Sequence, residues 1–417
     1  MRTGVVRAAA AALSSVVLMA AGAADATAGG NHRASGARMP APDMAAVRTA
    51  LGRTVGAGAP GAFAVIRDGG ATTAARTATI GKADLNGTPM NASWRFRAGS
   101  NTKMFTAALV LRLAERNRIK LDRPMRDYLP PGTLPKGWTM TVRQVMQHRA
   151  GIYDHTYDLL GGPGEETTSA FEKRVRNTVY RPGQLAALSV KHGVQYPPGT
   201  RYAYSNTDYV LLGMAIEHVT HRPYADVLRE QILRPLRLTG TSFVVPTRTI
   251  AGPHITGYLT NDNHSRPPLN ATEQTASWIW SAGAVISSAA DMDRFLGALL
   301  GGRLLSAASL RQMTSVLPTS TPRVAYGLGI REITLSCGKV YGHSGVVQGY
   351  QSEVFATRDG KRTVVAFANA SNNGAVLRGL LSTLEPAFCG AAAPKPPPRR
   401  GRPAALGPIP VIGDIRV

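Results

Sequence analysis

The feature that most constrains this chain is a serine followed three residues later by a lysine, at the head of a long apolar stretch. Ser100 and Lys103 precede residues 104–115, which are mostly apolar and predict a buried helix. On a helix, residues at this spacing share one face about one turn apart. A serine hydroxyl there lies near unpaired backbone N–H groups, and a buried amine beside it can act as a base because burial lowers its pKa. The pair is therefore a candidate nucleophile with a candidate base.

This spacing is not specific when it stands alone. Ser336 and Lys339 repeat it in what we interpret as a turn. The alternative interpretation of the first pair makes Ser100 a helix N-cap and Lys103 a solvated residue of the first turn. A catalytic role therefore needs support from other parts of the chain.

Two further motifs give that support. Tyr204 and Asn206 form the only Tyr-x-Asn of the chain, on a loop that precedes a predicted helix. His343, Ser344 and Gly345 form the only His-Ser-Gly or His-Thr-Gly triplet, within a predicted strand. The order is thus Ser-x-x-Lys near a helix start, Tyr-x-Asn in a helical section, and His-Ser-Gly on a strand.

The order of the predicted elements indicates an α/β (α+β) fold. Alternating apolar patterns predict strands near both ends of the chain, and helical spacing dominates its middle. This order implies a central antiparallel sheet covered by N- and C-terminal helices, with an inserted all-α lobe. We expect an α/β lobe from residues 38–98 and 322–390, a mostly helical lobe at 99–321, and a site in the cleft between them. The predicted strands are 61–69, 74–82, 327–331, 340–345, 351–356 and 363–369, and the predicted helices include 40–52, 141–146, 208–218, 225–233, 291–300 and 375–388.

The two ends of the chain differ in composition from the rest. Residues 1–28 are expected to be a secretory signal peptide, because Arg2 and Arg7 precede a short apolar run with a small-x-small cleavage pattern at 26–28. A signal anchor that stays attached is the alternative. No later stretch reaches membrane length, so we expect a secreted, extracellular protein. The Pro-, Ala- and Arg-rich residues 391–417 are expected to be disordered.

The cysteines and the charge fit such a compartment. Cys337 and Cys389 are the only two cysteines, and a disulfide between them would close a loop of about fifty residues; two free thiols are the alternative. The formal net charge of +23 favours attraction to anionic cell-wall polymers. No nucleic-acid-reading motif is present, so we expect no nucleic-acid partner.

Neither a metal nor a cofactor is expected. His218 and His221 lie three residues apart, but no His-Glu-x-x-His and no clustered third ligand accompany them. A formal Gly-x-Gly-x-x-Gly at residues 56–61 precedes a predicted strand instead of following one, which argues against a nucleotide loop.

The three motifs, in this order, resemble those of the serine penicillin-recognising superfamily, which comprises the DD-peptidases and the serine β-lactamases. The likeness is greatest to the secreted D-alanyl-D-alanine carboxypeptidases of actinomycetes. It covers roughly residues 38–390, including 277–288, 341–356, 368–373 and both cysteines in register. The resemblance implies a β-lactamase-like serine hydrolase domain at residues 29–390.

The resemblance implies catalytic roles for five residues. Ser100 attacks a carbonyl and forms an acyl-enzyme, while Lys103 and Tyr204 form a proton relay in which either one is the base. Asn206 hydrogen-bonds the acyl side of the substrate. His343 stands where many relatives carry lysine, and it is expected to support the relay by electrostatics and hydrogen bonding.

Further residues are expected to bind the substrate. Arg331 matches the residue that grips a terminal carboxylate, for which a guanidinium fork is well shaped. The backbone N–H groups of Ser100 and Val346 are expected to form the oxyanion hole. The remaining members of the expected substrate site are Ser344, Gly345, Gln348 and Trp278.

Three departures from the family pattern affect the expected specificity. Ser344 and Val346 each replace a threonine, and residues 160–168 differ in length and content from the loop that shapes the acyl-side pocket. We expect a monomeric D-alanyl-D-alanine carboxypeptidase or transpeptidase that acts on D-Ala-D-Ala-terminated cell-wall peptides and is acylated by β-lactams. The alternatives are a β-lactamase, esterase or D-amino-acid amidase on the same scaffold, or a non-catalytic binding module.

Overall fold

A computed structural model describes residues 39–70, 72–161 and 165–392 of the chain. These residues belong to one compact unit. The segment predicted to be a signal peptide, and residues 393–417 of the tail predicted at 391–417, lie outside the described residues. Residues 391 and 392 of that predicted tail belong to the short 3-10 helix Gly390–Ala392. No helix within the described ranges has both the length and the apolar character that crossing a membrane requires.

The fold is built on an eight-stranded sheet in which every pair of neighbouring strands is antiparallel. The strand order is β2-β1-β12-β11-β10-β9-β8-β7. The first two strands therefore pair with the last third of the chain, and β10 lies within the sheet. The strands are β1 (Gly61–Asp68), β2 (Arg76–Gly81), β7 (Leu317–Pro318), β8 (Val324–Tyr326), β9 (Arg331–Leu335), β10 (Gly338–Val347), β11 (Tyr350–Ala356) and β12 (Arg362–Ala368).

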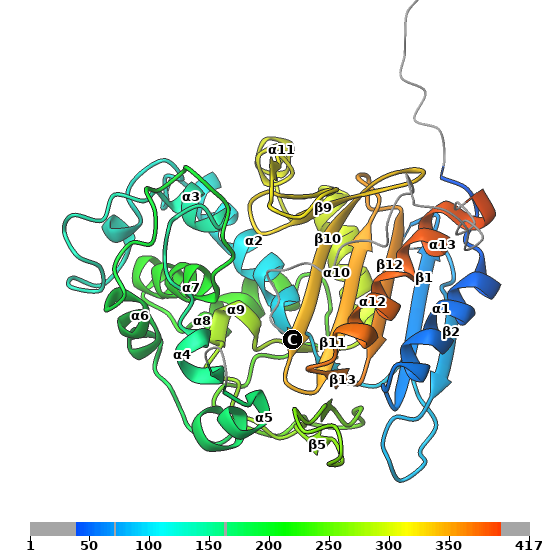
Figure 1. The fold of residues 1–417 in the computed structure, drawn as a ribbon. Coiled ribbons are helices and arrows are strands. Elements are labelled where there is room, and N and C mark those ends of the chain that lie inside the picture. Colours follow the sequence, from blue (N-terminus) through cyan, green and yellow to red (C-terminus); the bar gives the residue numbers. More distant parts are fainter. Residues whose placement is uncertain (1–38, 71, 162–164, 393–417) are drawn as a thin grey trace, which may run out of the picture. The chain divides into compact units, whose positions relative to one another are not determined.

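Helices from both ends of the described chain cover one face of this sheet (Figure 1). They are α1 (Met44–Gly56), α12 (Gly374–Leu381) and α13 (Leu384–Cys389). Val47 and Leu51 of α1 and Val376 of α12 belong to one buried apolar cluster with side chains of the sheet. Burial of apolar area at about 25 cal/mol per Å² is what holds such layers together.

The other face of the sheet carries α10 (Ala289–Leu300) and the start of the helical section. Helix α2 (Thr102–Glu115) lies between the sheet and the other helices, and nearly every one of its side chains is buried (Figure 1). The other helices are α3 (Val142–Met146), α4 (Thr156–Leu160), α5 (Thr167–Ala170), α6 (Pro182–Val190), α7 (Asn206–Thr220), α8 (Tyr224–Leu228), α9 (Trp280–Gly283) and α11 (Ala307–Met313). Short strands form two small sheets, β13 (Ala370–Ser371) with β4 (Tyr258–Leu259) and β5 (Leu269–Asn270), and β3 (Phe96–Arg97) with β6 (Ile286–Ser287).

The predicted fold class is confirmed, but two predicted elements are wrong in detail. Residues 327–330 form a turn between β8 and β9 instead of a strand, because Gly329 has a φ of +77° and an added Cβ there would lie 2.4 Å from the Cβ of Ala107. The predicted helix 375–388 is two helices, since Pro386 lacks an N–H and its ring would clash with the carbonyl of Ser382 in a continuous helix. The predicted division into two lobes stays a prediction, although α10 comes from the section expected to be helical and packs on the sheet.

A disulfide joins Cys337, in the turn between β9 and β10, to Cys389 at the end of α13. The two residues are 52 positions apart in the sequence. The bond therefore fastens the start of β10 to the last helix of the fold.

Replacing Cys337 and Cys389 together by serine should lower the free energy of unfolding by roughly 3–4 kcal/mol, because the unfolded chain regains the entropy of a loop of that length. Urea unfolding followed by circular dichroism measures this change. Wild-type protein under reducing conditions is the matched control and should show a similar shift. An unchanged midpoint in both samples would contradict the expected contribution of the bond.

Candidate active site

Ser100 lies at the junction between the sheet and the helical section. It belongs to the 3-10 helix η1 (Gly99–Asn101), which runs directly into α2, and it is 6% exposed. The side chain of Asn101 fixes this turn, because its Nδ2 donates to the Ala98 carbonyl at 3.1 Å and to Ser352 Oγ of β11 at 2.9 Å. The hydroxyl is thereby presented from a turn that is bonded to the sheet.

Two glycines allow η1 to approach β10 closely. Gly99 has a φ of +54°, and a Cβ at this position would lie 2.8 Å from the backbone nitrogen of Val346. A Cβ at Gly345 would lie 2.1 Å from the Ala98 carbonyl oxygen. Real side chains do not tolerate such distances to backbone atoms. The final glycine of the His-Ser-Gly motif is therefore required by the packing of β10 against η1 (Gly99–Asn101), the nucleophile turn.

Lys103 and Tyr204 both contact the hydroxyl of Ser100. The distance from Lys103 Nζ to Ser100 Oγ is 3.0 Å, and Tyr204 Oη donates to the same oxygen at 2.8 Å. Lys103 Nζ also donates to Asn206 Oδ1 at 2.7 Å and to the Ala282 carbonyl at 2.9 Å. A neutral amine has two hydrogens, and these two oxygens accept both of them. Its lone pair is then directed at the hydroxyl of Ser100.

The electrostatic environment separates the roles of Lys103 and Tyr204. Lys103 is fully buried, and burial lowers its pKa well below the usual 10.5. Burial raises the pKa of Tyr204 well above its usual 10.0, with a further rise from Tyr326. The neutral amine and the neutral phenol are therefore the favoured forms. Lys103 is placed to accept the proton of Ser100, and Tyr204 is placed to donate one.

Asn206 is the first residue of α7, and both ends of its amide are bonded. Its Oδ1 accepts from Lys103, while its Nδ2 donates to Asp154 Oδ2 at 2.9 Å. One N–H of the amide is left, and Asn206 lines the cavity beside Ser100. Its expected bond to the acyl side of the substrate stays a prediction.

His343 lies behind Tyr204, with the two ring centroids 6.3 Å apart. Its Nδ1 is 2.6 Å from the Ser344 carbonyl, which can only accept, so the proton of the neutral ring is on Nδ1. Tyr326 Oη then donates to Nε2 at 2.9 Å. Burial, Arg331 and Lys103 lower the pKa of His343 well below 6.5, so the ring is neutral at neutral pH. Its expected support of the relay stays a prediction, and this geometry provides a hydrogen bond to Tyr326 instead of a cation.

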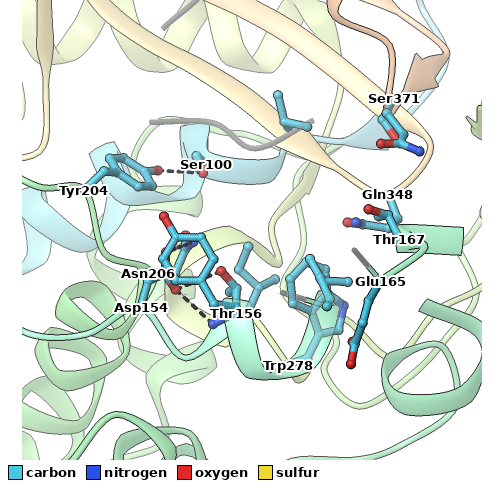
Figure 2. A pocket seen from close by; sticks show the side chains of 16 residues that line it. Ser100, Asp154, Thr156, Glu165, Thr167, Tyr204, Asn206, Trp278, Gln348 and Ser371 are labelled. Carbon is cyan, nitrogen blue, oxygen red and sulfur yellow. Dashed lines mark hydrogen bonds between the residues drawn. The ribbon is translucent and has the colours of Figure 1, made fainter. Parts of the chain in front are cut away.

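A cavity of about 190 Å³ opens at Ser100, between the sheet and the helical section. Figure 2 shows Tyr204 on one side of Ser100, with Asn206 and Asp154 below them and Gln348 and Trp278 on the far side. Six of the residues predicted from the sequence line this cavity. They are Ser100, Tyr204, Asn206, Trp278, Val346 and Gln348. The other lining residues are Asp154, Thr156, Tyr157, Leu160, Gly161, Glu165, Thr167, Ile279, Ser371 and Asn372.

Three residues expected to bind the substrate do not reach this cavity. Arg331 is fully buried, and its guanidinium carbon lies 5.5 Å from the centre of the Tyr204 ring and 5.8 Å from that of Tyr326. Ser344 is also fully buried, and its Oγ donates to Glu353 Oε2 at 2.7 Å. Gly345 has no side chain, and its role in this structure is to allow the close packing of β10 against η1. In this arrangement Arg331 presents no exposed surface to a substrate carboxylate.

Three site residues were not found from the sequence. Asp154 bonds Asn206; His148 packs against Tyr204 with ring centroids 4.3 Å apart; and Glu353 accepts from Ser344. Burial raises the pKa of Glu353 to about 8. A buried-strand pattern interrupted by a carboxylate is a usable signal for Glu353, whereas His148 and Asp154 lie in a polar loop without a motif of their own.

The comparison with known proteins agrees with this geometry. The family profile described as Beta-lactamase matches residues 41–381. The chain belongs to this family. The predicted membership in the serine penicillin-recognising superfamily is thus confirmed, and the chain is a serine hydrolase of β-lactamase-like fold.

Its relatives differ in what their names say they act on. A D-stereospecific amidohydrolase from Streptomyces sp. is 34% identical with a TM-score of 0.72, covering 81% of this chain and 98% of that one. D-amino acid amidase from Ochrobactrum anthropi SV3 is 26% identical with a TM-score of 0.69, covering 82% and 97%. A D-aminopeptidase of Cereibacter sphaeroides (strain ATCC 17029 / ATH 2.4.9) is 28% identical over 342 residues, covering 81% and 61%. The chain spans between 55% and 63% of the length of the first curated relatives that it matches.

Replacing Gly345 by alanine should lower the free energy of unfolding by roughly 1–3 kcal/mol and slow acylation of Ser100, because the new Cβ forces β10 away from the nucleophile turn. Thermal unfolding and the reaction with p-nitrophenyl acetate measure the two effects. Gly183→Ala is the matched control, since a Cβ there meets no atom within 4 Å. A Gly345→Ala variant with wild-type stability and rate would refute the steric requirement.

The rate of acylation should rise with pH along a limb set by Lys103, because only the neutral amine accepts a proton from Ser100. Its pKa is lowered by burial, so this limb should lie well below pH 10.5. In the Lys103→Arg variant the guanidinium stays protonated at every accessible pH and cannot accept the proton of Ser100. Its acylation rate should therefore be roughly 10²–10⁴-fold lower. The pH profile with an activated ester measures the limb. Tyr204→Phe is the control: it should react more slowly, but its rate should rise over the same pH range as that of the wild type. A rise centred near pH 10.5, or a Lys103→Arg variant that remains active, would contradict Lys103 as the base.

Proposed function

We propose that the chain hydrolyses amide or peptide bonds on the carbonyl side of a D-amino acid, through an acyl-enzyme on Ser100. The observation that carries this proposal is the hydroxyl of Ser100 held at 3.0 Å from Lys103 Nζ and 2.8 Å from Tyr204 Oη, at the edge of a cavity. The D-configuration is supported by the names of the amidohydrolase, amidase and aminopeptidase relatives.

The reaction follows from the hydrogen bonds at Ser100. As Ser100 Oγ attacks the carbonyl carbon, its proton moves to the neutral amine of Lys103. Tyr204 donates its proton to the leaving nitrogen and is restored by the ammonium of Lys103. Water then attacks the ester, with the same groups working in reverse order. The proposed oxyanion donors are the N–H groups of Ser100 and Val346, whose backbones meet at Gly99.

D-alanyl-D-alanine carboxypeptidase or transpeptidase activity is one form of this proposal. The bond between the two D-alanines lies on the carbonyl side of a D-residue, and the family is one whose members react with β-lactams. The His-Ser-Gly motif and Arg331 support this form through their resemblance to the carboxypeptidases. The burial of Arg331 and Ser344 favours substrates that do not depend on a terminal carboxylate.

We also propose that the protein works in an oxidising, extracytoplasmic compartment. The disulfide between Cys337 and Cys389 supports this location, because such bonds persist mainly outside the reducing cytosol. The formal charge of +23 supports attraction to anionic polymers of a cell wall.

A substrate panel tests the function. Wild-type protein should hydrolyse D-phenylalanine amide in preference to its L-enantiomer, and Ser100→Ala should lose at least about 10⁴-fold in rate. Diacetyl-Lys-D-Ala-D-Ala and nitrocefin, measured beside the amide, determine which form of the activity is present. Mass spectrometry after reaction with penicillin should show an adduct on Ser100. Equal rates on both enantiomers, or an activity that survives Ser100→Ala, would refute the proposal.

A further inference from the structure

The wall of the cavity carries negative charge in a strongly basic protein. Of the described residues that line it, Asp154 and Glu165 are the only ones with a formal charge at neutral pH, and both are acidic. The chain as a whole has a formal charge of +23. Lys103 lies beneath the wall, but burial lowers its pKa and favours its neutral form. Arg331 lies 5.5 Å from the ring centre of Tyr204 but is fully buried and does not line the cavity. The surface of the cavity is therefore suited to a cationic group on a ligand.

Asp154 is a buried carboxylate whose described hydrogen bonds all come from neutral donors. It is 6% exposed, and it accepts from Asn206 Nδ2 at 2.9 Å, from the Thr156 backbone N–H at 3.0 Å and from Thr156 Oγ1 at 2.8 Å. His155 Nδ1 lies 4.0 Å away, but burial lowers the pKa of this histidine and leaves it neutral at neutral pH. Lys103 is joined to Asp154 through Asn206, and in its neutral form it gives this carboxylate no cationic partner. A buried carboxylate in that state is costly, and a ligand cation would relieve the cost.

Gln348 provides a second, independent sign of a ligand. It lines the same cavity and is 8% exposed. Figure 2 shows its side chain directed into the cavity, across from Asp154. Among the hydrogen bonds of the described residues, none involves the side-chain amide of Gln348, although a buried amide normally makes at least one. This amide can therefore hydrogen-bond a ligand from the wall across from Asp154.

Glu165 adds negative charge at the far side of the cavity but is less suited to bind a cation directly. Its side chain is 54% exposed, and its carboxylate is paired with Arg174. An exposed pair of this kind contributes little to binding a further charge. Asp154 is therefore the carboxylate that a ligand would meet.

We propose that Asp154 binds a primary ammonium group on the acyl side of the substrate, in a cavity whose other wall carries Gln348. The inference rests on the proposed function, and it narrows the substrate class to amides and peptides whose D-residue has a free amino group. An N-acylated residue cannot supply this cation. Ser100 and Asp154 line one cavity, and Asn206 and Lys103 join them through consecutive hydrogen bonds. Asp154 is thus a specificity-determining residue.

The test compares D-alanine p-nitroanilide with N-acetyl-D-alanine p-nitroanilide, which share a leaving group and differ in the ammonium. At pH 7 most α-amino groups are protonated. Wild-type protein should prefer the free amine in kcat/KM by roughly tenfold or more, and Asp154→Asn should bring this ratio to about one. Because Asp154 also holds Asn206, the asparagine variant is expected to slow both substrates, and only the ratio reports the ammonium contact.

Two control variants separate charge from positioning. Thr156→Val removes a hydrogen bond to Asp154 but leaves its carboxylate, so the preference for the free amine should remain. Glu165→Gln removes the other acidic side chain of the cavity and should keep most of the preference, because Arg174 already pairs with it. Equal slowing of both substrates by Asp154→Asn, with an unchanged ratio, would overturn the proposal. A wild-type preference for the acetylated substrate would do the same.

A binding measurement keeps this inference distinct from the proposed function. Isothermal titration of D-alaninamide and of N-acetyl-D-alaninamide into the Ser100→Ala protein requires no turnover. Binding of the free amine alone, lost in Ser100→Ala/Asp154→Asn, would support the ammonium subsite even if neither anilide is cleaved and the proposed function fails. Cleavage of the anilides without any such binding difference would refute the subsite and leave the function standing.

Discussion

The site depends on the burial of one amine. Lys103 belongs to α2, and its side chain contacts residues of α7 and α9. Its Nζ has three oxygen neighbours, and the residue has no exposed surface. Burial makes the charged form unfavourable, so the amine is available as a base at pH values where a solvated lysine would be protonated. The same burial disfavours the phenolate of Tyr204. The two groups therefore have complementary roles for one physical reason, the exclusion of water from the space between the sheet and the helices.

Excluding water in this way requires that sheet and helices meet closely, and small residues make that possible. Gly99 and Gly345 bring the nucleophile turn against β10, and Asn101 bonds that turn to Ser352 of β11. The wall of the cavity across from β10 belongs to the helical section, where Asp154 orients Asn206 and Asn206 orients Lys103. Each component is ordinary by itself. Together they hold the hydroxyl of Ser100 between the amine of Lys103, the proposed base, and the phenol of Tyr204, the proposed proton donor.

Much of this arrangement could be predicted from the sequence, because it is encoded in local motifs. Ser100 and Lys103 are neighbours on one helical turn, and the strand pattern around His343 placed it on the sheet. The convergence of Tyr204 on Ser100 came from the resemblance, since 104 positions separate them. The interior position of Arg331 could not be predicted from the sequence, because exposure depends on contacts with residues far away in the chain, such as Tyr204. Asp154 was missed because its bond to Asn206 spans 52 positions and follows no periodicity.

The disulfide has a consequence for how strand β10 keeps its alignment. Side chains alternate along a strand, so a slip of β10 by one residue would turn His343 to the opposite face and remove the glycine from beneath Ala98. The bond between Cys337 and Cys389 fixes the first residues of β10 to α13, and the contact of Gly345 fixes its far part to the nucleophile turn. A strand tied at two points along its length has a single register available to it. The cross-link thus protects the alignment of a motif that lies several residues away from either cysteine.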